Sequence, residues 1–199
     1  MTIGIIGAMD EEVAVLKEEM NIEETLEYAS MQFCKGTLCG KNVVIVRSGI
    51  GKVNAAICAQ VLADKFEVDY LINTGIAGSL DAKLDIGDFV ISCEAMYHDF
   101  DCVNFGYPMG QVPGMDVLTF PADKSMIDYA FAAAEAVNPG HTKKGRVVSG
   151  DQFISDSAVK DRLITVFEGD CAGKGDIQAQ IQIDFGAFPA AGIAVHDAL

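Results

Sequence analysis

The sequence lacks the features that mark membrane, secreted and nucleic-acid-binding proteins. Its apolar runs are short and interrupted by Gly, Asp and Lys, so none approaches the roughly 20 residues of a membrane span. No basic segment precedes the first apolar run, so we expect no secretory leader and a cytoplasmic protein. Basic residues are few, with 14 Lys and Arg against 29 Asp and Glu, a net charge of −15 at pH 7. This charge repels phosphate backbones and anionic lipids, so we expect neither nucleic acid nor membrane as a partner.

Motifs for common cofactors and nucleophiles are also missing. The six cysteines form no CxxC pair and are expected to be reduced thiols rather than disulfides or zinc ligands. The GxxxxGK[ST] loop is absent, and Gly49-Ile50-Gly51 lacks the third glycine of the dinucleotide fingerprint, which disfavours ATP and NAD sites. No Gly-x-Ser-x-Gly elbow occurs. His98 has two nearby aspartates but no second histidine, so loop-fixing hydrogen bonds are favoured there over a metal site.

The sequence does contain an alternation of apolar strand-like runs and helical periodicity. Strands are expected at 3–7, 31–38, 42–47, 70–73, 89–91 and 145–149, and helices at 10–20, 53–65, 125–137 and 157–166. Residues 39–41 are expected to form a hairpin turn. Residues 97–114 are expected to form a long loop of the kind that is usually functional. The pattern predicts an α/β fold with a mixed or mainly parallel sheet and helices on both faces.

Three segments at the ends of predicted strands are candidates for chemistry, because ligands bind at the carboxyl ends of strands in such sheets. They are 7–12, 48–52 and 73–78. The first places Asp10, Glu11 and Glu12 at a helix start, where the helix dipole alone explains acidic residues. Glu12 is the one that could turn toward the strand ends and take a proton from water. Glycines in the third segment let the backbone approach a flat ligand, although helix packing explains them equally well.

A series of ordered motifs covers the chain from residue 1 to about 171. They are MTIGIIGAMDEEV (1–13), SGIGKVNAA (48–56), INTGIAG (72–78), YHDFD (97–101), FGY (105–107), GQVPG (110–114) and VSGDQFI (148–154). Together they resemble the bacterial 5'-methylthioadenosine/S-adenosylhomocysteine nucleosidases.

The resemblance implies a nucleoside phosphorylase-like fold, with a twisted mixed central sheet surrounded by helices, in a homodimer. It implies hydrolysis of the adenine–ribose bond of methylthioadenosine or adenosylhomocysteine, a step of methionine salvage, without metal or cofactor. Glu12 matches the carboxylate that activates the attacking water. A carboxylate suits this chemistry, because breaking the bond builds an oxocarbenium-like sugar while water must lose a proton.

The resemblance also assigns residues to the sugar and base. Met9 and Ile50 match side chains near the ribose and the alkylthio group. Ala77 and Gly78 match residues that line the base pocket. The implied substrate is therefore a small adenine thio-nucleoside.

Two further pairs of residues match the family's pattern. Phe153 and Ile154 match the pair that stacks on adenine and meets it through backbone groups. Phe105 and Pro113 match residues that reach across the dimer interface to cover the alkylthio tail. The implied site therefore draws on both copies of the chain.

The likeness ends after Ala172. The family continues with Glu-Met-Glu-Gly-Ala-Ala, whose Met and second Glu bind the ribose hydroxyls, and later supplies an Asp that protonates adenine. Here residues 173–178 read GKGDIQ, and Asp176 and Asp197 are the available stand-ins. We expect one domain over 1–199, family-like over 1–172, with an atypical or incomplete tail over 173–199. Such a change is what a shifted reading frame would produce.

Two alternatives remain beside the nucleosidase. The chain could be a catalytically inactive protein of the same fold that binds adenine nucleosides, because the tail lacks the family's acid. It could also be a purine nucleoside phosphorylase, which would need a basic phosphate site built from Arg47, Arg146 or Arg162.

Overall fold

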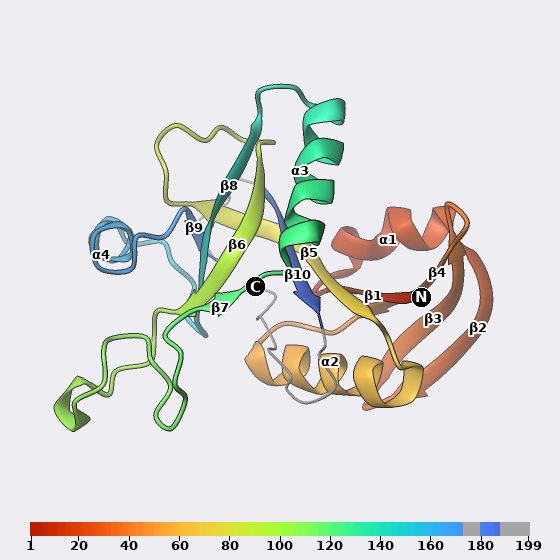
Figure 1. The fold of residues 1–199 in the computed structure, drawn as a ribbon, viewed down its shortest axis with the longest axis horizontal. Helices are drawn as coiled ribbons and strands as arrows, with labels where there is room; N and C mark the ends of the chain where they lie inside the picture. The colour runs from red at the N-terminus through yellow and green to blue at the C-terminus, as the bar shows by residue number, and fades with distance from the viewer. Residues whose placement is uncertain (173–179, 188–199) are drawn as a thin grey trace. The chain divides into compact units, whose positions relative to one another are not determined.

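The computed structural model describes residues 1–172 and 180–187 (Figure 1). The described chain groups into two compact units, of which Met1–Gly75 makes up most of unit 1 and residues 76–172 make up most of unit 2. Strand β5 (Tyr70–Ser79) begins in unit 1 and ends in unit 2. Strand β10 (Gln180–Ala187) pairs in parallel with β6 through residues 181–183.

Unit 1 is a mixed sheet whose strand order is β5-β1-β4-β3-β2. Its other strands are β1 (Thr2–Gly7), β2 (Asn21–Tyr28), β3 (Met31–Leu38) and β4 (Lys41–Arg47). Strand β1 is parallel to both β4 and β5, whereas β2, β3 and β4 are successively antiparallel. The carboxyl ends of β1 and β4 therefore lie side by side.

Two helices cover opposite faces of this sheet (Figure 1). Helix α1 (Asp10–Glu19) packs Val13 with Ile5 and Ile45. Helix α2 (Lys52–Phe66) packs Leu62 on the other face, where the alternate strand residues point. The period-two alternation of strand side chains thus gives unit 1 a core on each face.

Unit 2 is built on β6 (Phe89–Tyr97) and β8 (Thr142–Ser149), which run parallel along their whole length. Strand β9 (Cys171–Ala172) joins β8 to the end of β5, and β7 (Phe120–Pro121) pairs with β6.

Helix α3 (Lys124–Val137) lies along β6 and β8. Helix α4 (Ser157–Phe167) packs Leu163 and Phe167 against Met96 and Val148. Between β6 and β7 the chain makes a long excursion with one short helix, η1 (Val103–Phe105), which Figure 1 shows at its tip.

Each predicted strand and helix is present, but β6 and β8 extend beyond the predicted 89–91 and 145–149, and the short strands β7 and β9 were not predicted. Strand β5 continues to Ser79, so the glycine-rich segment 73–78 lies within a strand and not in a loop after it. Strand β2 was not predicted, because its side chains are mostly exposed and show no apolar alternation. The predicted hairpin turn is confirmed at Cys39 and Gly40, whose φ angles of 49° and 73° suit a tight two-residue turn.

The structure also bears on the expected state of the cysteines and on membrane spans. The six cysteines form no disulfides among the described residues, and burial raises the pKa of the Cys58 thiol to about 12. None of the helices in the described part of the chain is long and apolar enough to cross a membrane.

Candidate active site

The first turn of α1 holds Glu12 in a defined position. Its Oε2 accepts hydrogen bonds from the backbone N–H groups of Ala8 and Met9, at 2.7 and 3.0 Å. Asp10 turns outward instead and pairs with Arg47, with 3.2 Å between Oδ1 and Nε. Of the acidic residues that begin α1, Glu12 therefore folds back onto the turn that follows β1.

Two glycines make room for the first turn of α1, and one of them, Gly75, makes room for this carboxylate. A Cβ on Gly75 would lie 2.7 Å from Oε1 of Glu12, and a Cβ on Gly7 would lie 2.6 Å from Cγ1 of Val13. Both distances are shorter than real Cβ contacts, so a side chain at either position would displace its neighbour. The sequence analysis missed this role of Gly75. The only available signal was a glycine inside a strand, which often marks a close approach.

The turn after β4 lies beside the turn after β1. The N–H of Ser48 donates to the carbonyl of Gly7 at 2.9 Å, which ties the two turns together. Gly49 and Gly51 have φ angles of +83° and +106°, which other residues rarely adopt, and Asn54 donates its side-chain N–H to the carbonyl of Ile50. Unit 1 thus brings together the turns that carry Glu12, half-buried Met9 and Ile50, whose side chain is 57% exposed.

In unit 2, Ala77 and Gly78 lie at the end of β5. Both are buried, and Gly78 pairs with Ala172 of β9. The Ala77 side chain packs with Val90, Val147 and Cys171 in a core cluster. These two residues could therefore contact a ligand mainly through their backbone N–H and carbonyl groups.

The loop that follows β8 carries Phe153 and Ile154. Their side chains have opposite environments, because Phe153 is 62% exposed and Ile154 is 2% exposed. Ile154 packs with Leu163 and Phe167 of α4. The loop is therefore anchored by one residue and presents the aromatic ring of the other.

Phe105 and Pro113 lie on the excursion between β6 and β7. Phe105 belongs to η1 and is 82% exposed, and Pro113 is exposed as well. The excursion is fixed at its base, where the N–H of Gly110 donates to the carbonyl of Phe100 at 2.8 Å. The short helix η1, to which Phe105 belongs, lies at the tip of this excursion (Figure 1).

Two buried polar side chains, to which the sequence assigns no individual role, lie on β5 and at the end of β8. Asn73 on β5 and Ser149 at the end of β8 are almost completely buried. Within the described ranges, Oδ1 of Asn73 and Oγ of Ser149 have no hydrogen-bond partner. Such atoms are uncommon in native proteins, and they mark places where a further polar group would be accepted.

The three arginines that a phosphate site could use are engaged elsewhere. Arg47 pairs with Asp10, as described above. Arg146 donates from Nε to Glu94 at 2.8 Å and from Nη1 to the carbonyl of Phe167 at 2.7 Å. Arg162 contacts the sulfur of Met109 and lies over the ring of Phe167. Asp176 and Asp197, the candidate stand-ins of the tail, lie outside the described residues.

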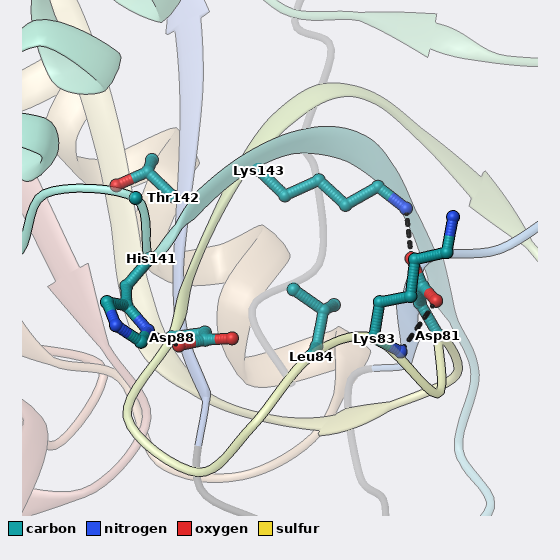
Figure 2. Close-up of a pocket in the computed structure, with 8 residues that line it drawn as sticks. Asp81, Lys83, Leu84, Asp88, His141, Thr142 and Lys143 are labelled. Carbon is teal, nitrogen blue, oxygen red and sulfur yellow. Dashed lines mark hydrogen bonds and ion pairs between the residues drawn. The ribbon is translucent and has the colours of Figure 1, made fainter.

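A separate pocket of about 260 Å³ opens at the amino ends of β6 and β8, opposite to the ends that carry the predicted site (Figure 2). It contains a His141–Asp88 pair with 2.7 Å between Nδ1 and Oδ1, and an ion pair between Lys143 and Asp81. The hydrogen bond from Lys143 holds the pKa of Asp81 below its ordinary value. These charged side chains pair with one another within the pocket, so we interpret their role as structural and not as ligand binding.

Known proteins resemble this chain over most of its length. The model of the phosphorylase superfamily matches residues 2–173 and so stops where the sequence departs from the expected pattern. The 5'-methylthioadenosine/S-adenosylhomocysteine nucleosidase of Anoxybacillus flavithermus is 44% identical over 167 residues, which cover 84% of this chain and 72% of that protein.

Solved structures agree with the sequence comparison. The nucleosidase of Colwellia psychrerythraea in complex with adenine has a TM-score of 0.83 and 35% identity, covering 92% of this chain and 80% of that one. The nucleosidase of Neisseria meningitidis in complex with methylthio-immucillin-A has a TM-score of 0.83 and 33% identity, covering 92% and 83%.

These likenesses confirm the predicted nucleoside phosphorylase-like α/β fold with its mixed sheet. They rest on the same part of the chain that carries the Glu12 turn and the Phe153 loop. The chain therefore belongs to the 5'-methylthioadenosine/S-adenosylhomocysteine nucleosidases of the phosphorylase superfamily.

Proposed function

We propose that this chain hydrolyses the bond between adenine and ribose in 5'-methylthioadenosine and S-adenosylhomocysteine, without a metal or cofactor. The similarity to nucleosidases of these two compounds and the adenine bound to the Colwellia psychrerythraea nucleosidase support this substrate class. The observation that carries the proposal is the carboxylate of Glu12, held by two backbone N–H groups at the start of α1.

Glu12 acts as the general base in this proposal. Cleavage of the bond builds positive charge on the sugar, and adenine departs with the bonding electron pair and takes up one proton. The attacking water gives up a proton to Glu12, so that one water is consumed and no net proton is released. Because Oε2 is anchored to the N–H groups of Ala8 and Met9, the carboxylate has a fixed orientation toward an incoming water. Fixed orientation of a reacting group lowers the entropic part of the barrier.

The remaining site residues bind the substrate. Exposed Ile50 and half-buried Met9 provide apolar surface for the ribose and the alkylthio group. The exposed ring of Phe153 stacks on adenine, while the backbone of buried Ile154 meets its polar edge.

Ala77 and Gly78 line the base pocket through their backbone. Their burial at the end of β5, where Gly78 pairs with Ala172 of β9, supports this role, because a strand fixes the direction of its carbonyl and N–H groups.

The proposal extends to assembly and location. The chain folds as one domain and forms a cytoplasmic homodimer, in which Phe105 and Pro113 cover the alkylthio tail held by the other copy. The exposure of the Phe105 ring supports this, because it leaves a large apolar side chain available for contact with a second copy. Sedimentation of the purified chain tests the dimer, and a concentration-independent monomer would contradict it.

The ion pairs that the arginines form favour hydrolysis over phosphorolysis. A phosphorylase needs cations that face a phosphate ion, but Arg47 and Arg146 are engaged with the carboxylates of Asp10 and Glu94. Moving Arg146 to a phosphate would leave the partly buried carboxylate of Glu94 unpaired.

The test is adenine release from methylthioadenosine by the purified full chain, with and without added phosphate. The proposal predicts release at the same rate in both buffers. Release that requires phosphate would make the chain a phosphorylase. Binding of methylthioadenosine without release would make it an inactive adenine-nucleoside-binding protein of the same fold.

A further inference from the structure

The ends of β6 and β8 are joined beyond the point where the two strands stop pairing. The ladder between them ends at Tyr97 and Ser149. The N–H of His98 then donates to the carbonyl of Ser149 at 2.9 Å. One residue further on, the carboxylate of Asp99 accepts from the N–H of Asp151, also at 2.9 Å. A side chain thus continues the connection where backbone pairing has ended.

Gly150 is enclosed between these two bonds. A Cβ at this position would lie 2.5 Å from Nε2 of His98 and 3.0 Å from Cγ of Asp99. The imidazole therefore packs directly on the backbone of Gly150. His98 is 6% exposed, and its ring meets the ring of Phe167 edge-on at 6.5 Å. The imidazole is fixed between α4 and the loop.

The other end of the loop is fixed as well. The carboxylate of Asp156 caps α4 by accepting from the N–H groups of Ala158 and Val159, at 2.8 and 3.1 Å. Ile154 is buried against α4, as described above. The backbone from 150 to 156 is thus held at both ends, and the exposed ring of Phe153 projects from a fixed frame.

We propose that His98 and Asp99 are positioning residues that clamp the 150–154 loop, so that Phe153 and Ile154 are placed for adenine before it binds. This inference rests on the proposed function for its ligand, but the clamp itself is a property of the free protein. A loop that is already ordered loses less conformational entropy on binding, so the clamp strengthens adenine binding.

The experiment compares Asp99→Ala with Asp99→Asn in the full chain. Alanine removes the acceptor for the Asp151 N–H, whereas asparagine keeps an acceptor oxygen at the same place. Asp101→Ala is the matched control, because Asp101 lies on the same loop and its carboxylate accepts from the nearby N–H of Val103.

Two readouts are taken for each variant. The first is amide hydrogen exchange at residues 151–154 in the free protein, and the second is the dissociation constant for adenine. We expect Asp99→Ala to speed exchange at these amides and to weaken adenine binding by about three- to tenfold. Asp99→Asn should restore most of both, and Asp101→Ala should change neither.

The outcomes separate the clamp from the proposed function. Unchanged exchange in Asp99→Ala, or an equal effect in Asp101→Ala, would overturn the clamp. Faster exchange with unchanged adenine affinity would overturn its role in binding. If the unmodified chain binds no adenine, the proposed function fails, while exchange at residues 151–154 still decides the clamp.

A measurement on the unmodified chain tests the clamp even if a variant fails to fold. The Asp151 amide, which donates to Asp99, should exchange more slowly than the amide of exposed Gln152. Equal exchange at the two positions would overturn the clamp without any substitution. As a second perturbation, Gly150→Ala should speed exchange at the same amides as Asp99→Ala, because its methyl group would collide with the imidazole.

Discussion

The Glu12 turn of unit 1 and the Phe153 loop of unit 2 hold their key side chains in different ways. The carboxylate of Glu12 is fixed directly by two backbone hydrogen bonds and by the absence of a side chain at Gly75. The ring of Phe153 is largely exposed and depends on the burial of its neighbour Ile154. In the proposed mechanism, the group that moves a proton is therefore held by its own contacts, whereas the ring that stacks on adenine is held through its backbone.

The largest difference between the two regions should appear when Glu12 is changed to glutamine. Removing the base should lower the turnover of methylthioadenosine by about 10²–10⁴-fold. Affinity for adenine should stay within a few fold of the unmodified chain, because the ring of Phe153 is untouched. Steady-state kinetics and equilibrium binding measure the two effects. A variant that retains full turnover would remove Glu12 from the mechanism.

Gly75→Ala should disturb the same carboxylate indirectly. Its methyl group would lie 2.7 Å from Oε1 of Glu12, which must then move. A misplacement of about 1 Å costs on the order of 10²-fold in rate. Gly4→Ala is the control within unit 1, because its methyl group would meet the ends of the Leu62 and Val68 side chains, at 3.0 and 3.4 Å, and not Glu12. Equal losses of turnover in the two variants would mean that Gly75 matters only for folding.

Two neighbouring substitutions should separate anchoring from stacking in the unit 2 loop. Ile154→Ala should lower the free energy of unfolding by about 2–5 kcal/mol, because it opens a cavity against α4. Phe153→Ala should leave stability within about 0.5 kcal/mol, because the ring is exposed. It should instead weaken adenine binding by about 1–3 kcal/mol. Urea unfolding and calorimetry provide the two measurements, and a reversed pattern would contradict the assignment.

The smallest effect should appear at Asp88, away from both regions. The N–H of Asp85 holds the pKa of this carboxyl below its ordinary value, burial opposes the shift, and the bond to His141 adds to it. The carboxylate therefore stabilises the fold above its unfolded pKa of about 3.9, and this contribution is lost as the pH falls through the lower folded value.

Asp88→Asn should accordingly flatten the acid side of the stability curve. Urea midpoints measured from about pH 6 down to about pH 2 should fall less steeply in this variant than in the unmodified chain. Exposed Asp116, changed to asparagine, is the control in the same unit. A variant curve that is as steep as the original would remove Asp88 from the acid response.

The sequence predicted the fold where burial leaves a periodic signal. Strands β1 and β4 are apolar runs because helices cover both of their faces, and α1 shows its spacing through Val13 and Leu16. Strand β2 escaped prediction because it is an exposed edge rich in glutamate, which discourages pairing with other chains but leaves no apolar pattern. The extension of β5 to Ser79 was missed because its glycines resemble a loop.

The candidate site was predictable in its residue types but not in its contacts. An acidic cluster at the start of a helix, together with the family resemblance, singled out Glu12. The fit of Glu12 against Gly75, and the bond between Asp99 and Asp151, join residues that are far apart in the chain. Such contacts depend on the register of the strands, which hydrophobic periodicity alone does not determine.

The most direct test of the account is the identity of the sugar formed from methylthioadenosine in a phosphate-containing buffer. Mass spectrometry of the products distinguishes free methylthioribose from its 1-phosphate ester. The account predicts adenine and free methylthioribose in equal amounts, because water activated by Glu12 is the nucleophile. A phosphate ester, or the absence of any adenine, would contradict it.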